Sequence, residues 1–206
     1  MGRTTSDRGL CGGLNIEISK KVLSHINEGK REKIISVGTK GCEYFKLRGK
    51  NVICNYNDVS ETVFYSDAEG IARYLATLYI TGEIDEAFLA YTQYKSVLTH
   101  IPRIVQILPL RCSSNNGGAE DPKMNLDPNV HDYLYHAVPM YLNASIYEAL
   151  VESSACEHAA RMVSMDTAVH NAFDIITKLT RTYNRKRQAT ITQELSEIVT
   201  SSNMLG

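Results

Sequence analysis

A glycine-rich segment near the start of the chain is the first candidate for chemistry. Gly9, Gly12 and Gly13 surround Cys11 at a predicted turn before a helix, where backbone N–H groups could cradle a phosphate. The spacing matches neither GxGxxG nor a GxxxxGK loop, so a tight turn for close packing is favoured over a nucleotide site. Cys11 could act as a nucleophile at a helix N-terminus, but no Cys/His/Asn pattern surrounds it.

A second candidate is a basic run near the other end of the chain. No acidic residue lies between Asp174 and Glu194, and the cations in this interval are Lys178, Arg181, Arg185, Lys186 and Arg187. Such a run forms either a solvated face or a docking patch for acidic loops of another protein. The net charge of the whole chain is −1, which argues against nucleic acid as the partner.

The remaining residues give no metal or cofactor pattern. The six histidines include no HExxH motif, and the five cysteines are odd in number and widely spaced, without CxxC. We therefore predict buried, reduced thiols, no metal and no cofactor. Hydrophobic residues make up 43% and charged residues 22%, as in globular proteins. No apolar run approaches 18 residues and no secretory signal is present, so no bilayer-spanning segment is predicted.

The first 110 residues alternate strand-like and helix-like segments. Ser6 and Asp7 are expected to cap a helix carrying Leu14, Ile18, Val22 and Ile26. Ser66 and Asp67 are expected to cap a helix that stops at Gly82. Further segments are predicted as a helix over 39–47 and strands over 33–38, 51–55, 87–91 and 103–110. This order predicts an α/β fold with a Rossmann-like, mostly parallel sheet.

The C-terminal third reads as one very long helix. A loop rich in Ser, Asn, Gly and Pro over 112–129 separates an α/β domain, 1–128, from a helix over 129–206. Pro139 is expected to kink this helix or to start its main part, a rod of roughly 60 residues and about 90 Å. One face of the rod is apolar, which favours a coiled-coil seam that needs a partner helix; its members are Ala172, Ile175, Ile176, Leu179 and Tyr183, followed by Ile191, Leu195 and Ile198.

Three segments, in order along the chain, carry a specific resemblance. They are TSDRGLCGGLN at 5–15, EHAARMVSM at 157–165 and NRKRQATITQELSEIV at 184–199. Together they resemble the gamma subunits of F-type ATP synthases, over essentially the whole sequence. The resemblance implies a central rotor shaft: an α/β domain beside an antiparallel coiled coil of N- and C-terminal helices. The shaft would couple proton flow through the membrane sector to ATP synthesis or hydrolysis on the beta subunits, with no catalytic residue of its own.

The resemblance also implies partners and contact residues. The partners would be the alpha and beta subunits, the epsilon subunit (delta in mitochondria) and the c-ring. Arg187, Gln188 and Thr192 would meet beta-subunit loops in the upper shaft, and Arg161 would lie lower, near an acidic region of beta. The chain would be peripheral to a membrane, with the cytoplasmic side of a bacterial plasma membrane favoured over the matrix side of the mitochondrial inner membrane.

The sequence departs from the family at its start. The resemblance implies a long N-terminal helix and most of a central first strand that this sequence does not contain, so we expect the chain alone to be poorly soluble or to self-associate. Two other hypotheses stay open. One is a free-standing α/β nucleotide- or ligand-binding domain with a helical interaction tail, and the other is an unrelated coiled-coil adaptor.

Overall fold

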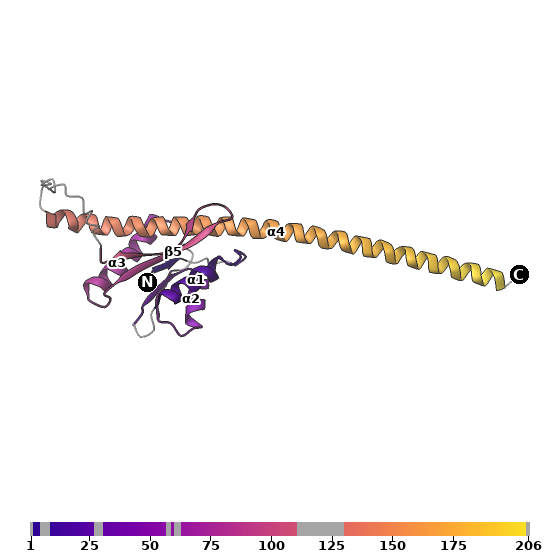
Figure 1. Cartoon of the computed structure of the whole chain (residues 1–206), viewed down its shortest axis with the longest axis horizontal. Coiled ribbons are helices and arrows are strands. Elements are labelled where there is room, and N and C mark those ends of the chain that lie inside the picture. Colours follow the sequence, from indigo (N-terminus) through magenta and orange to yellow (C-terminus); the bar gives the residue numbers. More distant parts are fainter. Residues whose placement is uncertain are drawn as a thin grey trace. The chain divides into compact units, whose positions relative to one another are not determined.

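The computed structural model describes residues 2–4, 9–26, 31–56, 59, 63–110 and 130–204. These residues fall into two compact units, Met1–Val163 and Ser164–Gly206. The elements, labelled in Figure 1, are β1 (Gly2–Thr4), α1 (Leu14–His25), β2 (Ile34–Val37), α2 (Thr39–Lys46), β3 (Val52–Tyr56), α3 (Tyr65–Ile80), β4 (Ala87–Tyr94), β5 (His100–Leu108) and α4 (Val130–Met204). Helix α4 begins in the first unit and continues through the second.

The sheet of the first unit has the order β3-β2-β1-β4-β5. Strands β1 to β4 are parallel, and β5 runs antiparallel to β4. The predicted α/β fold with a mostly parallel sheet and a long C-terminal helix is therefore confirmed. The central position of the sheet is occupied by β1, which has only three residues, Gly2–Thr4, and pairs with β2 on one side and with β4 on the other.

Two apolar clusters cover the two faces of this sheet. In one, α3 and the first part of α4 pack on β2, β4 and β5, through residues such as Leu75, Ile146 and Ile35. In the other, α1 and α2 pack on β2 and β4, through Ile18 and Phe45. Figure 1 shows the first part of α4 on the side of the sheet away from α1 and α2. The first unit is thus a three-layer α/β/α arrangement.

The observed N-caps of α1 and α3 are Gly13 and Phe64. Ser66 and Asp67 lie inside α3, whose N-cap is Phe64, so that prediction is wrong. Asp67 still stabilises the N-terminus of α3, because its carboxylate accepts a hydrogen bond from the Phe64 backbone N–H at 3.2 Å. Ser6 and Asp7 lie outside the described residues, and the observed N-cap of α1 is Gly13.

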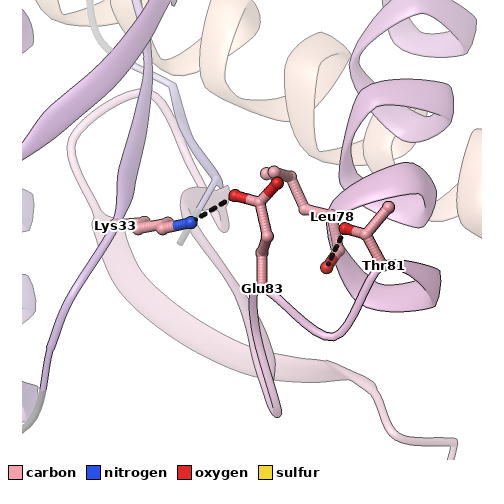
Figure 2. Close-up of polar contacts among 4 residues, drawn as sticks. All are labelled: Lys33, Leu78, Thr81 and Glu83. Carbon is pink, nitrogen blue, oxygen red and sulfur yellow. Dashed lines mark hydrogen bonds and ion pairs between the residues drawn. The ribbon is translucent and has the colours of Figure 1, made fainter.

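The end of α3 is tied to the start of β2 (Figure 2). Thr81 follows the last helical residue and donates its hydroxyl to the Leu78 carbonyl at 3.3 Å. Gly82 then takes a left-handed conformation with φ of 72°. The next residue, Glu83, accepts a hydrogen bond from the Lys33 ammonium at 2.5 Å. The helix stop predicted at Gly82 is therefore confirmed.

The strand and helix predictions differ from the structure mainly in their ends. Strand β4 continues to Tyr94, and β5 begins at His100, because these residues pair across a hairpin from Tyr94↔His100 to Ala87↔Leu108. Helix α4 starts at Val130, as expected, and runs without interruption past Pro139. Three of the thiols are buried as predicted, those of Cys11, Cys42 and Cys156. For Cys54 the prediction is wrong, because this residue is only half-buried, and Cys112 lies outside the described residues. None of the described helices combines the length and the apolar character needed to cross a membrane.

Candidate functional site

The glycine-rich segment forms a turn rather than an open loop. Leu10 and Gly12 both adopt left-handed backbone conformations, with φ of 68° and 59°. Cys11 between them is buried, and the Asn15 side-chain amide lies 3.3 Å from its sulfur. This geometry agrees with the predicted tight turn before α1. Within the described ranges, no group of three or more His, Cys, Asp or Glu residues is arranged to hold a metal ion.

The second compact unit presents an exposed helix from Met165 to Ser201. Every residue from Met165 to Ser201 is exposed. Exposed charge is expected on such a helix, but large apolar side chains are exposed as well, including Val169, Phe173, Ile176 and Leu179 at 52% to 63%. An isolated helix gains little from propensity alone and is stabilised mainly by burying an apolar face. This surface therefore has the composition of a contact surface.

The apolar residues of this helix follow a seven-residue repeat. Met165, Val169, Ala172, Ile176, Leu179 and Tyr183 alternate spacings of four and three, and we call these six residues the apolar seam. Such spacing is the pattern of a left-handed coiled coil. Lys186 and Thr190 occupy the next two positions of the repeat, and apolar residues return only at Ile191, Leu195 and Ile198. The seam thus ends where the basic run begins to dominate.

Gln188 and Thr192 lie together on one face beside part of the basic run. At 100° per residue, these two residues share an arc of about 80° with Lys178, Arg181 and Arg185. The Thr192 hydroxyl donates to the Gln188 carbonyl at 2.9 Å and leaves its oxygen lone pairs facing outward as acceptors. All five side chains are exposed.

Arg187 and Arg161 do not join that face. Arg187 is exposed but lies about 100° around the helix from Gln188, on the side of Ile191 and Ile198. Arg161 belongs to the first compact unit, and its guanidinium forms an ion pair with Glu157 one turn earlier. The four residues predicted as contacts are therefore two neighbours, Gln188 and Thr192, one residue on an adjacent face, and one residue in the other unit.

Two glutamates of α4 were not singled out by the sequence. The side chain of Glu157 is only 6% exposed, against 25% for its partner Arg161. Glu152 has a buried side-chain oxygen, Oε2, to which none of the residues that the structure describes offers a hydrogen bond. Burial, followed by the neighbouring Glu148 carboxylate, raises the pKa of Glu152, and Arg103 acts in the opposite direction. Glu152 and Glu157 could have been singled out from the sequence as charged residues on the otherwise apolar face of this helix.

The hairpin strand β4 contacts α4 next to these glutamates. Thr92 donates its backbone N–H to the Ser153 hydroxyl at 3.4 Å and accepts a hydrogen bond from the Cys156 thiol, also at 3.4 Å. Burial, with a smaller contribution from Glu152, raises the pKa of Cys156 to about 12, so the thiol remains protonated and able to donate. The Tyr91 pKa is also raised, by burial first and then by Glu152 and Glu148.

Comparison with known protein sequences matches the chain to one family over nearly its whole length. A family model described as ATP synthase matches residues 3–205. The ATP synthase gamma chain of Alkaliphilus metalliredigens is 40% identical over 206 residues, covering 98% of this chain and 71% of that protein. The ATP synthase gamma chain of Chlorobaculum parvum is 38% identical, again covering 98% of this chain and 71% of the relative.

Solved structures agree on the fold. A chain in the Euglena gracilis mitochondrial ATP synthase, solved with OSCP, F1 and the c-ring, superposes with a TM-score of 0.77 at 20% identity, covering 99% of this chain and 71% of that one. A chain in the central stalk and c-ring structure of the Tetrahymena thermophila mitochondrial ATP synthase gives a TM-score of 0.66 at 23% identity, covering 82% and 75%.

Proposed function

Because the chain belongs to the ATP synthase gamma-chain family, we propose that it is the central rotor shaft of an F-type ATP synthase. In this role it couples proton flow through the membrane sector to ATP synthesis or hydrolysis on the beta subunits. The chain itself binds no cofactor and performs no bond chemistry. It contacts the alpha and beta subunits, the epsilon (or mitochondrial delta) subunit and the c-ring, and it is peripheral to the membrane.

The observation that carries this proposal is the exposed helix of the second unit. A large apolar side chain that is 38% to 65% exposed is unremarkable alone, but here exposure extends without a break from Met165 to Ser201. The apolar seam supplies a surface for a helical partner, as in the antiparallel coiled coil of the family. The face bearing Gln188, Thr192 and three cations supplies a polar surface for protein loops. Residues 129–206 are the proposed shaft, and 1–128 the domain that holds its first turns.

Coupling requires that the shaft distinguish the states of its partner. A partner can shift a conformational equilibrium only through contacts that differ between the two states. Arginine suits this purpose, since its charge is permanent and its planar guanidinium binds carboxylates in fixed directions. We propose that Arg187, Gln188, Thr192 and Arg161 make such contacts with the beta subunits, so that each shaft angle favours a different beta conformation.

Replacing Thr192 tests this role with a matched control. In the assembled synthase in sealed membrane vesicles, Thr192→Val should lower the number of ions pumped per ATP hydrolysed, by about fivefold, the low end of typical coupling between sites. Thr182→Val is the control, because the Thr182 hydroxyl makes the same kind of bond to the carbonyl four residues earlier, at 2.9 Å. Equal pumping by the two variants, combined with normal pumping by Gln188→Leu and Arg187→Gln, would refute the proposed contacts.

A titration separates this proposal from the α/β ligand-binding alternative. The shaft account expects no heat above dilution when ATP or NAD is added to the purified chain in a calorimeter. Saturable heat with one site per chain would favour the binding-domain alternative instead. Recovery of partners other than synthase subunits in a pulldown would favour the adaptor.

A further inference from the structure

Glu157 is a carboxylate on the buried face of α4. That face packs on the sheet through Leu142, Ile146, Ala149 and Leu150, all 3% exposed or less. It continues through the polar Ser153 and the buried Cys156, and then reaches Glu157, which is 4% exposed. Removing a carboxylate from water is costly unless a positive partner and hydrogen bonds compensate it. The burial of the Glu157 carboxylate therefore has to be explained by the positively charged group that it binds.

The helix beside Glu157 is fixed in position. Thr92 of β4 hydrogen-bonds to both Ser153 and Cys156. Thr92 is itself buried, at 4% exposure. The carboxylate of Glu157 thus projects from a stretch of backbone that is anchored to the central sheet, and it has little freedom to move.

Arg161 is held by this carboxylate and yet reaches solvent. Its Nη2 group donates to Glu157 Oε1, and its side chain is 25% exposed. A guanidinium has five N–H donors in a rigid plane, so one bonded edge leaves other donors available. A free arginine side chain loses rotamer entropy when it is fixed, and an anchored one has already lost part of that freedom.

We propose that Glu157 is the positioning residue for Arg161: the buried carboxylate fixes the direction in which the guanidinium presents its remaining N–H donors to an acidic surface of the beta subunit. This inference rests on the proposed function and adds a residue to it. An exposed i,i+4 pair would have little influence on either partner. Here the acid is almost fully buried, so the anchored end of the pair is Glu157 and the presented end is Arg161.

The test uses the assembled synthase in sealed membrane vesicles, with ions pumped per ATP as the readout. Glu157→Gln and Arg161→Gln should each lower this ratio by about fivefold. Because both act through one contact, the double variant should be no worse than Arg161→Gln alone. Glu148→Gln is the matched control, since Glu148 is exposed on the same helix, and its ratio should be unchanged.

A shortened acid separates positioning from simple stabilisation of the fold. Glu157→Asp keeps the buried charge but withdraws it by one methylene, so it should assemble with alpha and beta subunits at normal yield and still pump poorly. Normal pumping by Glu157→Asp, or by assembled Glu157→Gln complexes, overturns the positioning role. Normal pumping by Arg161→Gln while Thr192→Val remains impaired also overturns it and leaves the proposed function standing. Normal pumping by both of these variants, and also by Gln188→Leu and Arg187→Gln, refutes the proposed contacts with the beta subunits as well.

Discussion

The two parts of α4 carry similar apolar patterns, but the apolar face of the first part is buried and that of the second part is exposed. From Leu142 to Leu150 the apolar face of the helix is buried against the sheet and α3. From Met165 to Ser201 every residue of the helix is exposed, including the six residues of the apolar seam. The difference lies in the neighbours available and not in the helix itself. A periodic apolar stripe therefore predicts that a surface will be covered, but whether this chain or another protein covers it depends on the rest of the structure.

The largest expected effect follows from a pair of leucines, one in each part. Leu150→Ala should lower the free energy of unfolding of the purified chain by about 2–5 kcal/mol, because it opens a cavity in the core. Leu179→Ala, at a position that is 62% exposed, should change it by less than about 0.5 kcal/mol. Urea unfolding followed by circular dichroism measures both.

In the assembled complex, substitution of the exposed Leu179 should have an effect that it lacks in the purified chain. If the apolar seam is a contact surface, Leu179→Ala should weaken assembly of the chain into the synthase, while Leu150→Ala acts mainly on the chain itself. A complex that tolerates Leu179→Ala and also Ile176→Ala without loss of yield or thermal stability would contradict the assignment of the seam.

A pH-dependent effect is expected at Glu152 in the buried part. Its pKa is raised from 4.5 in the folded chain, so the folded state holds this proton more tightly than the unfolded state does. The resulting contribution to stability is present below pH 4.5 and is lost as the pH rises through the raised value. Glu152→Gln should remove this loss and raise stability at neutral pH by about 1 kcal/mol, the lower end of the cost of a buried unpaired polar atom.

Its control is Glu194, an exposed carboxylate on the same helix that is remote from Glu152 in the sequence. Thermal melts of Glu152→Gln and Glu194→Gln between pH 4 and pH 8 compare the two positions directly. A Glu152→Gln variant whose melting temperature follows the wild-type pH profile would show that the buried oxygen Oε2 finds a partner in solution.

The smallest effect is expected at the ion pair between Lys33 and Glu83. The two side chains are 29% and 52% exposed, and pairs of this kind contribute about 0–1 kcal/mol. Glu83→Gln should therefore shift the urea midpoint only slightly, and less at high salt. A loss as large as that of Leu150→Ala would mean that this pair holds the α3–β2 connection in place.

Much of the architecture was predictable from local patterns, and the exceptions have physical causes. The short β-branched runs and the glycine at position 82 were sufficient for β2 and for the end of α3. Strand β1 was missed because Gly2, Arg3 and Thr4 have no apolar alternation, and pairing with β2 and β4 makes them a strand. The ends of the β4–β5 hairpin were missed for the same reason, since cross-strand pairing extends both strands.

The candidate site was predictable only in part. The resemblance singled out Gln188 and Thr192, which share a face, but nothing in the sequence separates Arg187 from them except its angle around the helix. Glu157 was overlooked because a search for apolar periodicity ignores a charged residue on the apolar face. Its importance becomes visible only when burial of the carboxylate and the direction of Arg161 are known together.

Hydrogen exchange along α4 tests the central claim most directly. In the purified chain, amides of residues 165–201 should exchange fast, since no tertiary packing supports that helix, while those of residues 142–156 should be protected. After assembly with the alpha and beta subunits, protection should rise strongly over 165–201 and stay the same over 142–156. Unchanged exchange over residues 165–201 after assembly would contradict the claim that this exposed helix is the shaft surface.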